Sequence, residues 1–160
     1  MCLGSMVGGC RQAANRSNGS QHRHGTPPGD AMIAADIIGA QAEIAASLHF
    51  NLAWTGSLNM KAPDIGGLID VRSTMGRDKN LIIRADDPDE RPFILIWAVG
   101  EGHFELVGWL RASTAKNAQY LREQRYGGQA YYYPHQMLHS IELLERELLM
   151  VKQARLASGG

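Results

Sequence analysis

The sequence has few cysteines, no net charge and no hydrophobic run long enough to cross a membrane. Only two of its 160 residues are cysteine, Cys2 and Cys10, which excludes a disulfide framework and a CxxC zinc site and favours a reducing, cytoplasmic setting. No apolar stretch reaches the roughly 18 residues of a transmembrane helix, so no membrane partner is expected. Because 16 basic residues balance 16 acidic ones, any contact with nucleic acid must use a local groove.

Common catalytic motifs are missing as well. GxGxxG, GxxxxGK[ST], GxSxG and HExxH do not occur, which argues against nucleotide-binding folds and the usual hydrolases. The chain is 44% hydrophobic and about one domain long. Residues 1–30 are rich in Gly, Ser, Asn, Gln and Pro and have no hydrophobic period, which predicts a disordered tail. Residues 31–160 are then expected to form a single domain.

Hydrophobic periodicity predicts the elements of this domain. Apolar residues at helical spacing predict a helix over 31–50, with Asp30 as its cap. Four strand-like runs follow, at 68–73, 81–85, 93–99 and 104–110, and the third is apolar on both faces, so we expect it at the centre of a sheet. A helix over 113–124, a strand over 130–133 and a long C-terminal helix complete the pattern. The order αββββαβα predicts an α+β (mixed α/β) fold with a central mixed sheet flanked by helices.

Charged residues gather where the first strand begins, in the segment APDIGGLIDVRST of residues 62–74. Strand alternation places Asp70 and Arg72 on one face, and Asp64 lies just before the strand in a Pro-Asp turn. Two carboxylates and a cation that converge here could hold a divalent metal ion and steady a phosphate. The alternative is a surface ion pair between Asp70 and Arg72, with ordinary turn chemistry at Asp64.

These residues resemble the motif of the PD-(D/E)XK nuclease superfamily, which has the restriction-endonuclease-like fold. Pro63-Asp64 is similar to its proline-acid pair, Asp70-Val71-Arg72 to its acid-x-lysine triplet, and Glu43 to its helical glutamate. The predicted order of elements is also similar to the αβββαβ core of that superfamily. The segments FELVGWLRASTAK and AYYYPHQML resemble those of small phage and bacterial proteins of this type. The resemblance covers about residues 36–141.

The resemblance implies a nuclease that hydrolyses DNA phosphodiester bonds with Mg²⁺ or Mn²⁺, in the cytoplasm of a bacterium or a phage-infected cell. Asp64, Asp70 and Glu43 would hold the metal ion, and Arg72 or Lys116 would offset the charge of the phosphate. The alternative is a catalytically inactive nuclease-like fold that acts as a nucleic-acid-binding or protein-assembly module.

Three further features carry predictions. Lys116 is expected in the first turns of the helix over 113–124, where a basic residue could contact a phosphate. His135 and His139 stand four residues apart at the expected start of the last helix, a spacing that can chelate a metal ion. The wide apolar face of that last helix predicts a homodimer.

Overall fold

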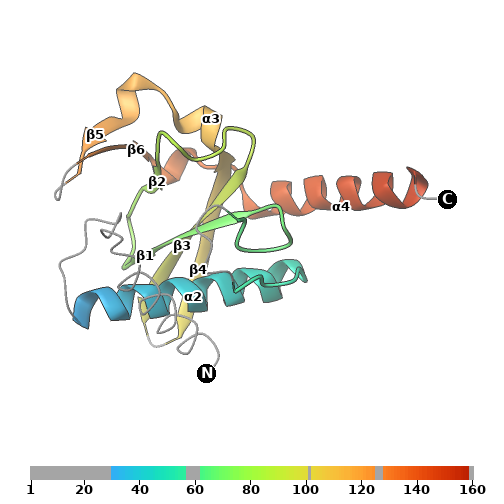
Figure 1. The fold of residues 1–160 in the computed structure, drawn as a ribbon, viewed down its shortest axis with the longest axis horizontal. Helices are drawn as coiled ribbons and strands as arrows, with labels where there is room; N and C mark the ends of the chain where they lie inside the picture. Colours follow the sequence, from blue (N-terminus) through green and yellow to red (C-terminus); the bar gives the residue numbers. More distant parts are fainter. Residues whose placement is uncertain (1–29, 57–61, 101, 125–127, 159–160) are drawn as a thin grey trace.

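A computed structural model of the protein describes residues 30–56, 62–100, 102–124 and 128–158 (Figure 1). In chain order the elements are α2 (Asp30–Phe50), β1 (Asp70–Met75), β2 (Leu81–Ile83), β3 (Pro92–Gly100), β4 (His103–Arg111), α3 (Ala112–Ala115), the 3₁₀ helix η1 (Ala118–Tyr120), β5 (Leu121–Glu123), β6 (Gln129–Tyr133), the 3₁₀ helix η2 (His135–Met137) and α4 (Ile141–Ser158). The domain is thus α+β, as predicted. The predicted tail lies outside the described residues, apart from Asp30.

The helix α2 matches its predicted bounds, and local chemistry ends it. Asn51 adopts the left-handed conformation, with a φ of 50°. Its N–H donates to the carbonyl of Leu48, and the N–H of Leu52 donates to the carbonyl of Ser47, which closes the last turn. The residues of α2 that are fully buried against the sheet are small, namely Ala40, Ala42 and Ala46. Small side chains let the helix lie close to β1 and β3, which it crosses in Figure 1.

In the described part of the chain the strands form two sheets of three strands each. The first has the order β1-β3-β4, with β1 parallel and β4 antiparallel to β3. β3 is its central strand and is buried on both faces, which confirms the prediction from its sequence. The second sheet is antiparallel and has the order β2-β6-β5.

Alternate residues of β3 belong to two different hydrophobic cores. Ile94 and Ile96 pack with α2, with α4 and with Trp109 of β4. Phe93 and Leu95 face the opposite way and pack with residues of the second sheet, namely Leu81, Ile83 and Tyr133. The second sheet therefore covers one face of the first sheet, while α2 and the start of α4 cover the other.

The predicted single central sheet is wrong in its connections. The sequence predicts that the four strand-like runs share one central sheet, but β1 and β3 are parallel neighbours, and two parallel neighbours cannot be joined by a tight hairpin. The connection between them instead passes through β2, which pairs with β6 in the second sheet. Of the four strand-like runs expected to form the central sheet, β3 and β4 are the consecutive pair that forms a hairpin, and Gly102 in its turn has a φ of 71°.

Two predicted helices are also shorter than their sequences suggested. α3 spans only Ala112–Ala115, and β5 occupies part of the range expected to be helical, because it pairs with β6. The side chain of Asn117 accepts a hydrogen bond from the N–H of Gln119, which favours a 3₁₀ turn instead of a continued helix. The last helix begins at Ile141 instead of near residue 135, because His139 forms an isolated backbone bridge with Trp109.

A close approach at Gly108 gives the first test of this fold. A Cβ atom at Gly108 would lie 2.7 Å from both the carbonyl oxygen of His139 and the Cβ of Leu138. Gly108→Ala should therefore force β4 and the 138–139 segment apart and lower the free energy of unfolding by roughly 1–3 kcal/mol, measured by denaturant titration. Gly39→Ala is the control, because its Cβ would meet only the Ser73 Oγ at 3.9 Å. Equal stability of the two variants would contradict this packing.

Candidate functional site

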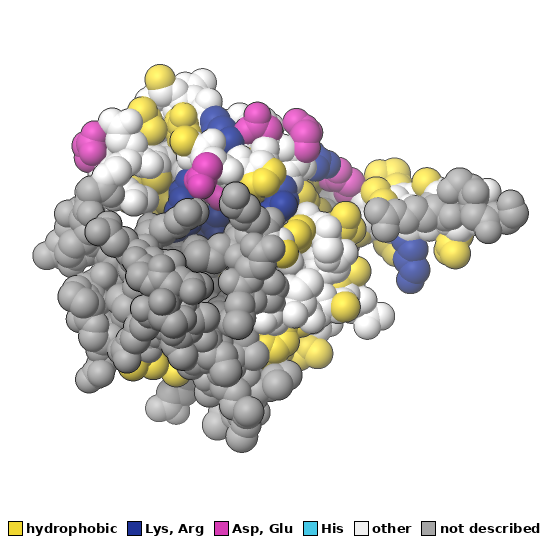
Figure 2. Space-filling model, in the orientation of Figure 1, with side chains coloured by type: hydrophobic (Ala, Val, Ile, Leu, Met, Phe, Trp, Pro, Cys, Tyr) yellow, Lys and Arg dark blue, Asp and Glu magenta, His cyan; other side chains and the backbone are white. Residues whose placement is uncertain are grey.

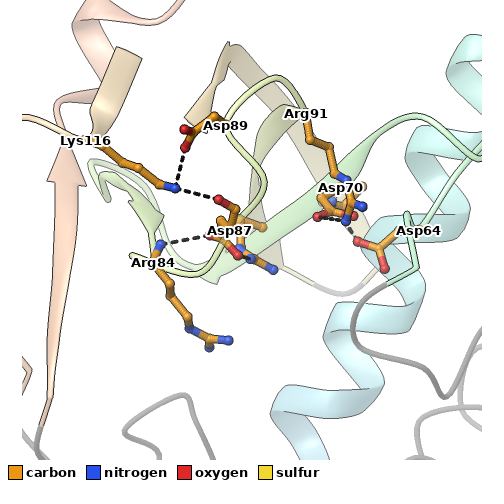
Figure 3. Close-up of polar contacts among 9 residues, drawn as sticks. Asp64, Asp70, Arg84, Asp87, Asp89, Arg91 and Lys116 are labelled. Atoms are coloured by element: carbon orange, nitrogen blue, oxygen red, sulfur yellow. Dashed lines mark hydrogen bonds and ion pairs between the residues drawn. The ribbon is translucent and has the colours of Figure 1, made fainter. Parts of the chain in front are cut away.

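A tight loop positions Asp64 against the start of β1. The N–H groups of Asp64 and Ile65 both donate to the carbonyl of Ile69, at 3.0 and 3.1 Å. Gly66 lies in the turn between Ile65 and Ile69 and has a φ of 60°. A Cβ atom on Gly66 would lie 2.9 Å from a methyl carbon of Leu52. The fold of this loop brings Oδ2 of Asp64 within 2.8 Å of the N–H of Val71, which donates to it. A separation of only five residues between Asp64 and Asp70 is thus enough to place them side by side (Figure 3).

Asp70 is buried, with 6% of its surface exposed, and its partner is Arg91. Nη1 of Arg91 donates to Oδ2 of Asp70 at 3.0 Å. Arg72 lies on the same face of β1, as predicted, but its Nη2 donates to Oδ1 of Asp87 at 2.8 Å. Its guanidinium also lies over the ring of Phe93, 4.9 Å from the centroid. The alternative of an exposed ion pair between Asp70 and Arg72 is therefore wrong.

Glu43 reaches the same region from α2 and is also buried, with 5% of its surface exposed. Nε1 of Trp54 donates to its Oε2 at 2.9 Å. Trp54 in turn forms a backbone bridge with Ile65, next to Asp64. The tryptophan thereby connects the helical glutamate to the loop that carries Asp64.

The electrostatics place the three carboxylates in one neighbourhood. Burial, followed by the charge of Glu43, raises the pKa of Asp64 to about 7, with Asp70 adding to the rise and Val71 and Arg72 opposing it. Burial also raises the pKa of Asp70, against the hydrogen bond and charge of Arg91 and the charge of Arg72. Ionisation of Asp64 is therefore unfavourable in this surrounding, and a cation bound beside it would lower its pKa.

The site offers carboxylate oxygens, which are the donors that Mg²⁺ prefers in proteins. Across the described ranges, no group of three or more His, Cys, Asp or Glu side chains is placed to hold a metal ion. Mg²⁺, however, commonly takes one or two carboxylates and completes its shell with water and substrate phosphate. Within the described part of the chain, Oδ1 of Asp64 accepts no hydrogen bond, whereas Asp70 is already neutralised by Arg91. Asp64 and Glu43 are thus the two carboxylates that could hold a metal ion here.

Lys116 does not join the carboxylates. It follows the short helix α3 instead of opening a long one, and its Nζ donates to the carbonyl of Asp87 at 2.6 Å and to Oδ1 of Asp89 at 2.5 Å (Figure 3). Asp87 also accepts from Arg72 and from the N–H of Arg84. Arg72 and Lys116 therefore both hold the loop of residues 84–91, and we call these contacts the loop clamp.

The histidine pair is wrong as a helical chelate. His135 lies in η2 with its ring 4.9 Å from that of Trp97, and His139 packs 5.4 Å from Trp109. Periodicity could not identify Arg91 as the partner of Asp70, because the two residues are 21 positions apart in sequence. An arginine at the end of the acidic run DDPDER was the only available hint.

Comparisons with family models, with curated proteins and with solved structures give no match to this chain. The described helices include none that is both long and apolar enough to span a membrane.

The raised pKa of Asp64 predicts a specific dependence of stability on pH. The folded state keeps the Asp64 carboxyl group protonated up to about pH 7, whereas the ordinary pKa of an aspartate is 3.8. As the pH rises between these two values, the ionised carboxylate therefore destabilises the fold increasingly. Asp64→Asn keeps an oxygen for the N–H of Val71 and removes the charge. Its melting temperature should therefore exceed that of the wild type by more at pH 8 than at pH 4.

The matched control is Asp78→Asn, at an exposed carboxylate, where the difference from the wild type should not grow with pH in this way. A pH-independent difference for Asp64→Asn would show that Asp64 titrates like a solvated carboxylate.

Proposed function

We propose that this domain is a Mg²⁺-dependent nuclease that hydrolyses DNA phosphodiester bonds, with a restriction-endonuclease-like arrangement of its site. The observation that carries the proposal is the half-buried carboxylate of Asp64, which lies beside Glu43 and Asp70 and keeps one oxygen unbonded among the described residues. A carboxylate in this setting is stabilised in its charged form by a divalent cation.

Each residue then has a distinct part. Asp64 and Glu43 would hold Mg²⁺ or Mn²⁺, which when bound lowers the pKa of a water molecule and stabilises the charge that develops on the phosphate. Asp70 would keep Arg91 in place at the edge of the site, through the ion pair at 3.0 Å. Arg72 lies close enough to lower the pKa of both aspartates, so its positive charge would also be felt by a bound phosphate.

A second candidate is a non-catalytic module of similar fold that binds nucleic acid or assembles with protein. The loop clamp favours it, because the two cations suggested for catalysis, Arg72 and Lys116, both have acidic or carbonyl partners in the 84–91 loop. In this alternative the charged residues serve to fix the loop, and the acidic site has no chemical role.

Cleavage assays separate the two candidates. Purified protein is incubated with linear, nicked, branched and single-stranded DNA in Mg²⁺, Mn²⁺ or EDTA. The wild type should cut at least one substrate in a metal-dependent manner. Asp64→Asn, which removes a proposed ligand charge, should lower the rate by orders of magnitude. Asp70→Asn, which removes the charge that holds Arg91, should also lower it, and Asp78→Asn should retain it. A wild type that cuts none of these and still shifts DNA in a gel without metal would favour the binding module. Cleavage unaffected by both site variants would show that the site lies elsewhere.

The loop clamp has its own test. Arg72→Gln removes the partly buried partner of Asp87 and should lower the free energy of unfolding by roughly 1–3 kcal/mol while raising amide exchange in residues 84–91. Arg72→Lys keeps the positive charge but loses the planar guanidinium over Phe93. If the charge acts on the phosphate, the lysine variant should cleave DNA faster than the glutamine variant at a temperature where both are folded. Equal rates would assign Arg72 to the loop clamp alone.

A further inference from the structure

The middle tyrosine of β6 points away from the hydrophobic core. Tyr131 and Tyr133 pack with the second core, on the side of the second sheet that faces β3. Because side chains alternate along a strand, Tyr132 lies on the opposite side of the sheet. Its side chain is half-buried and lines a hollow in the surface of the domain.

This hollow has a volume of about 600 Å³, which is in the range of small-molecule binding sites. A second tyrosine, Tyr120 of η1, also lines it. The ring of Tyr120 lies edge-on to that of Tyr133, with the centroids 4.8 Å apart. Its hydroxyl group lies 4.0 Å from Sδ of Met137. Contacts with the body of the domain therefore hold one aromatic wall of the hollow in place before any ligand binds.

Polar side chains line the hollow beside the two rings. Arg122 of β5 has no acidic partner among the described residues, and its Nη1 donates to the carbonyl of the preceding residue. The acid next to it, Glu123, is held by Gln129, whose Nε2 donates to Oε1 of Glu123 at 2.6 Å. Asn80 and Gln119 contribute amide groups, which can both donate and accept hydrogen bonds.

We propose that this hollow binds a nucleobase and its phosphate from a single-stranded nucleic acid. Aromatic side chains stack on bases of any sequence, and this stacking is a main source of affinity for single strands. The two amides can bond the free edge of an unpaired base, and the guanidinium of Arg122 can bind the phosphate. In a duplex the bases are stacked on one another, so their faces are closed to Tyr120 and Tyr132.

The charge of the protein also favours a single strand over a duplex. Proteins that bind duplex DNA gain much of their affinity from many contacts between basic residues and phosphates, and this chain has no net charge. Figure 2 shows mainly hydrophobic and uncharged polar side chains over β5, whereas acidic and basic ones gather nearer the centre of that view. Stacking needs no large basic surface. The hollow shares no residue with the acidic site, so the inference does not rest on the proposed nuclease activity.

Fluorescence anisotropy of labelled oligonucleotides tests the inference, in EDTA so that no metal-dependent cleavage occurs. The wild type should bind a short oligothymidylate or oligouridylate more tightly than a duplex of the same length. Tyr132→Leu should weaken this binding roughly tenfold, because it removes a ring on which a base stacks. Tyr132→Phe is the matched control, since it keeps the ring, and it should bind like the wild type. Asp64→Asn should also bind like the wild type, whatever its effect on cleavage.

Two further measurements locate the ligand without changing a tyrosine. Arg122→Gln alters an exposed side chain and should weaken binding severalfold, with a smaller dependence on salt concentration. An iodouracil-substituted oligonucleotide should photo-cross-link to Tyr132 or Tyr120 of the wild type. Cross-links found only outside the hollow would overturn the inference, as would equal affinities of the wild type and Tyr132→Leu.

The choice of ligand is tested in the same assay. A duplex bound as tightly as the single strand would overturn the inference. Competition by free thymidine monophosphate, with no binding of either oligonucleotide, would show that the hollow takes a nucleotide instead of a strand. Binding of a neutral oligosaccharide alone would assign the tyrosines to a sugar, against the part proposed for Arg122.

Discussion

The fold depends on one strand that has no polar face. Phe93, Leu95 and Trp97 of β3 point to one side and Ile94 and Ile96 to the other, and all five are buried. Such a strand can lie only where both faces of its sheet are covered. The helices α2 and α4 cover one face and the second sheet covers the other, so both hydrophobic cores are organised around β3.

The candidate site follows from this constraint. β1 is the edge strand beside β3, and its N–H at Val71 would be left without a partner if Asp64 did not accept it. Since one face of β1 looks toward α2 and the other toward the second sheet, the strand can bring Glu43 and Arg91 to the same place from opposite sides. Asp64 and Asp70 therefore lie at the start of β1, between the two hydrophobic cores. Burial at this position is the main cause of the raised pKa of both residues.

The sequence predicted those parts of the molecule that local chemistry determines. The bounds of α2, the burial of β3 and the shared face of Asp70 and Arg72 all follow from hydrophobic periodicity and strand alternation. The parallel pairing of β1 with β3 does not, because nothing in either strand distinguishes a parallel from an antiparallel neighbour. The segment over 113–124 has a helical pattern, yet pairing between β5 and β6 overrides it. The partners of Asp70 and Arg72 depend on the 84–91 loop, whose path is set by the long-range pairing of β2 with β6 just before it.

The charged residues around β1 form the acidic site and also hold the loop between the two sheets. Arg72 and Lys116 hold the middle of the 84–91 loop, at Asp87 and Asp89, and at its end Arg91 binds Asp70. β2 precedes this loop and β3 follows it, so the loop joins the second sheet to the first. A change at Asp70 would therefore act on the acidic site and on the attachment of the second sheet together. Asp64 instead accepts its hydrogen bond from Val71 of β1, so a change at Asp64 acts on the acidic site without breaking the ion pairs that hold the loop.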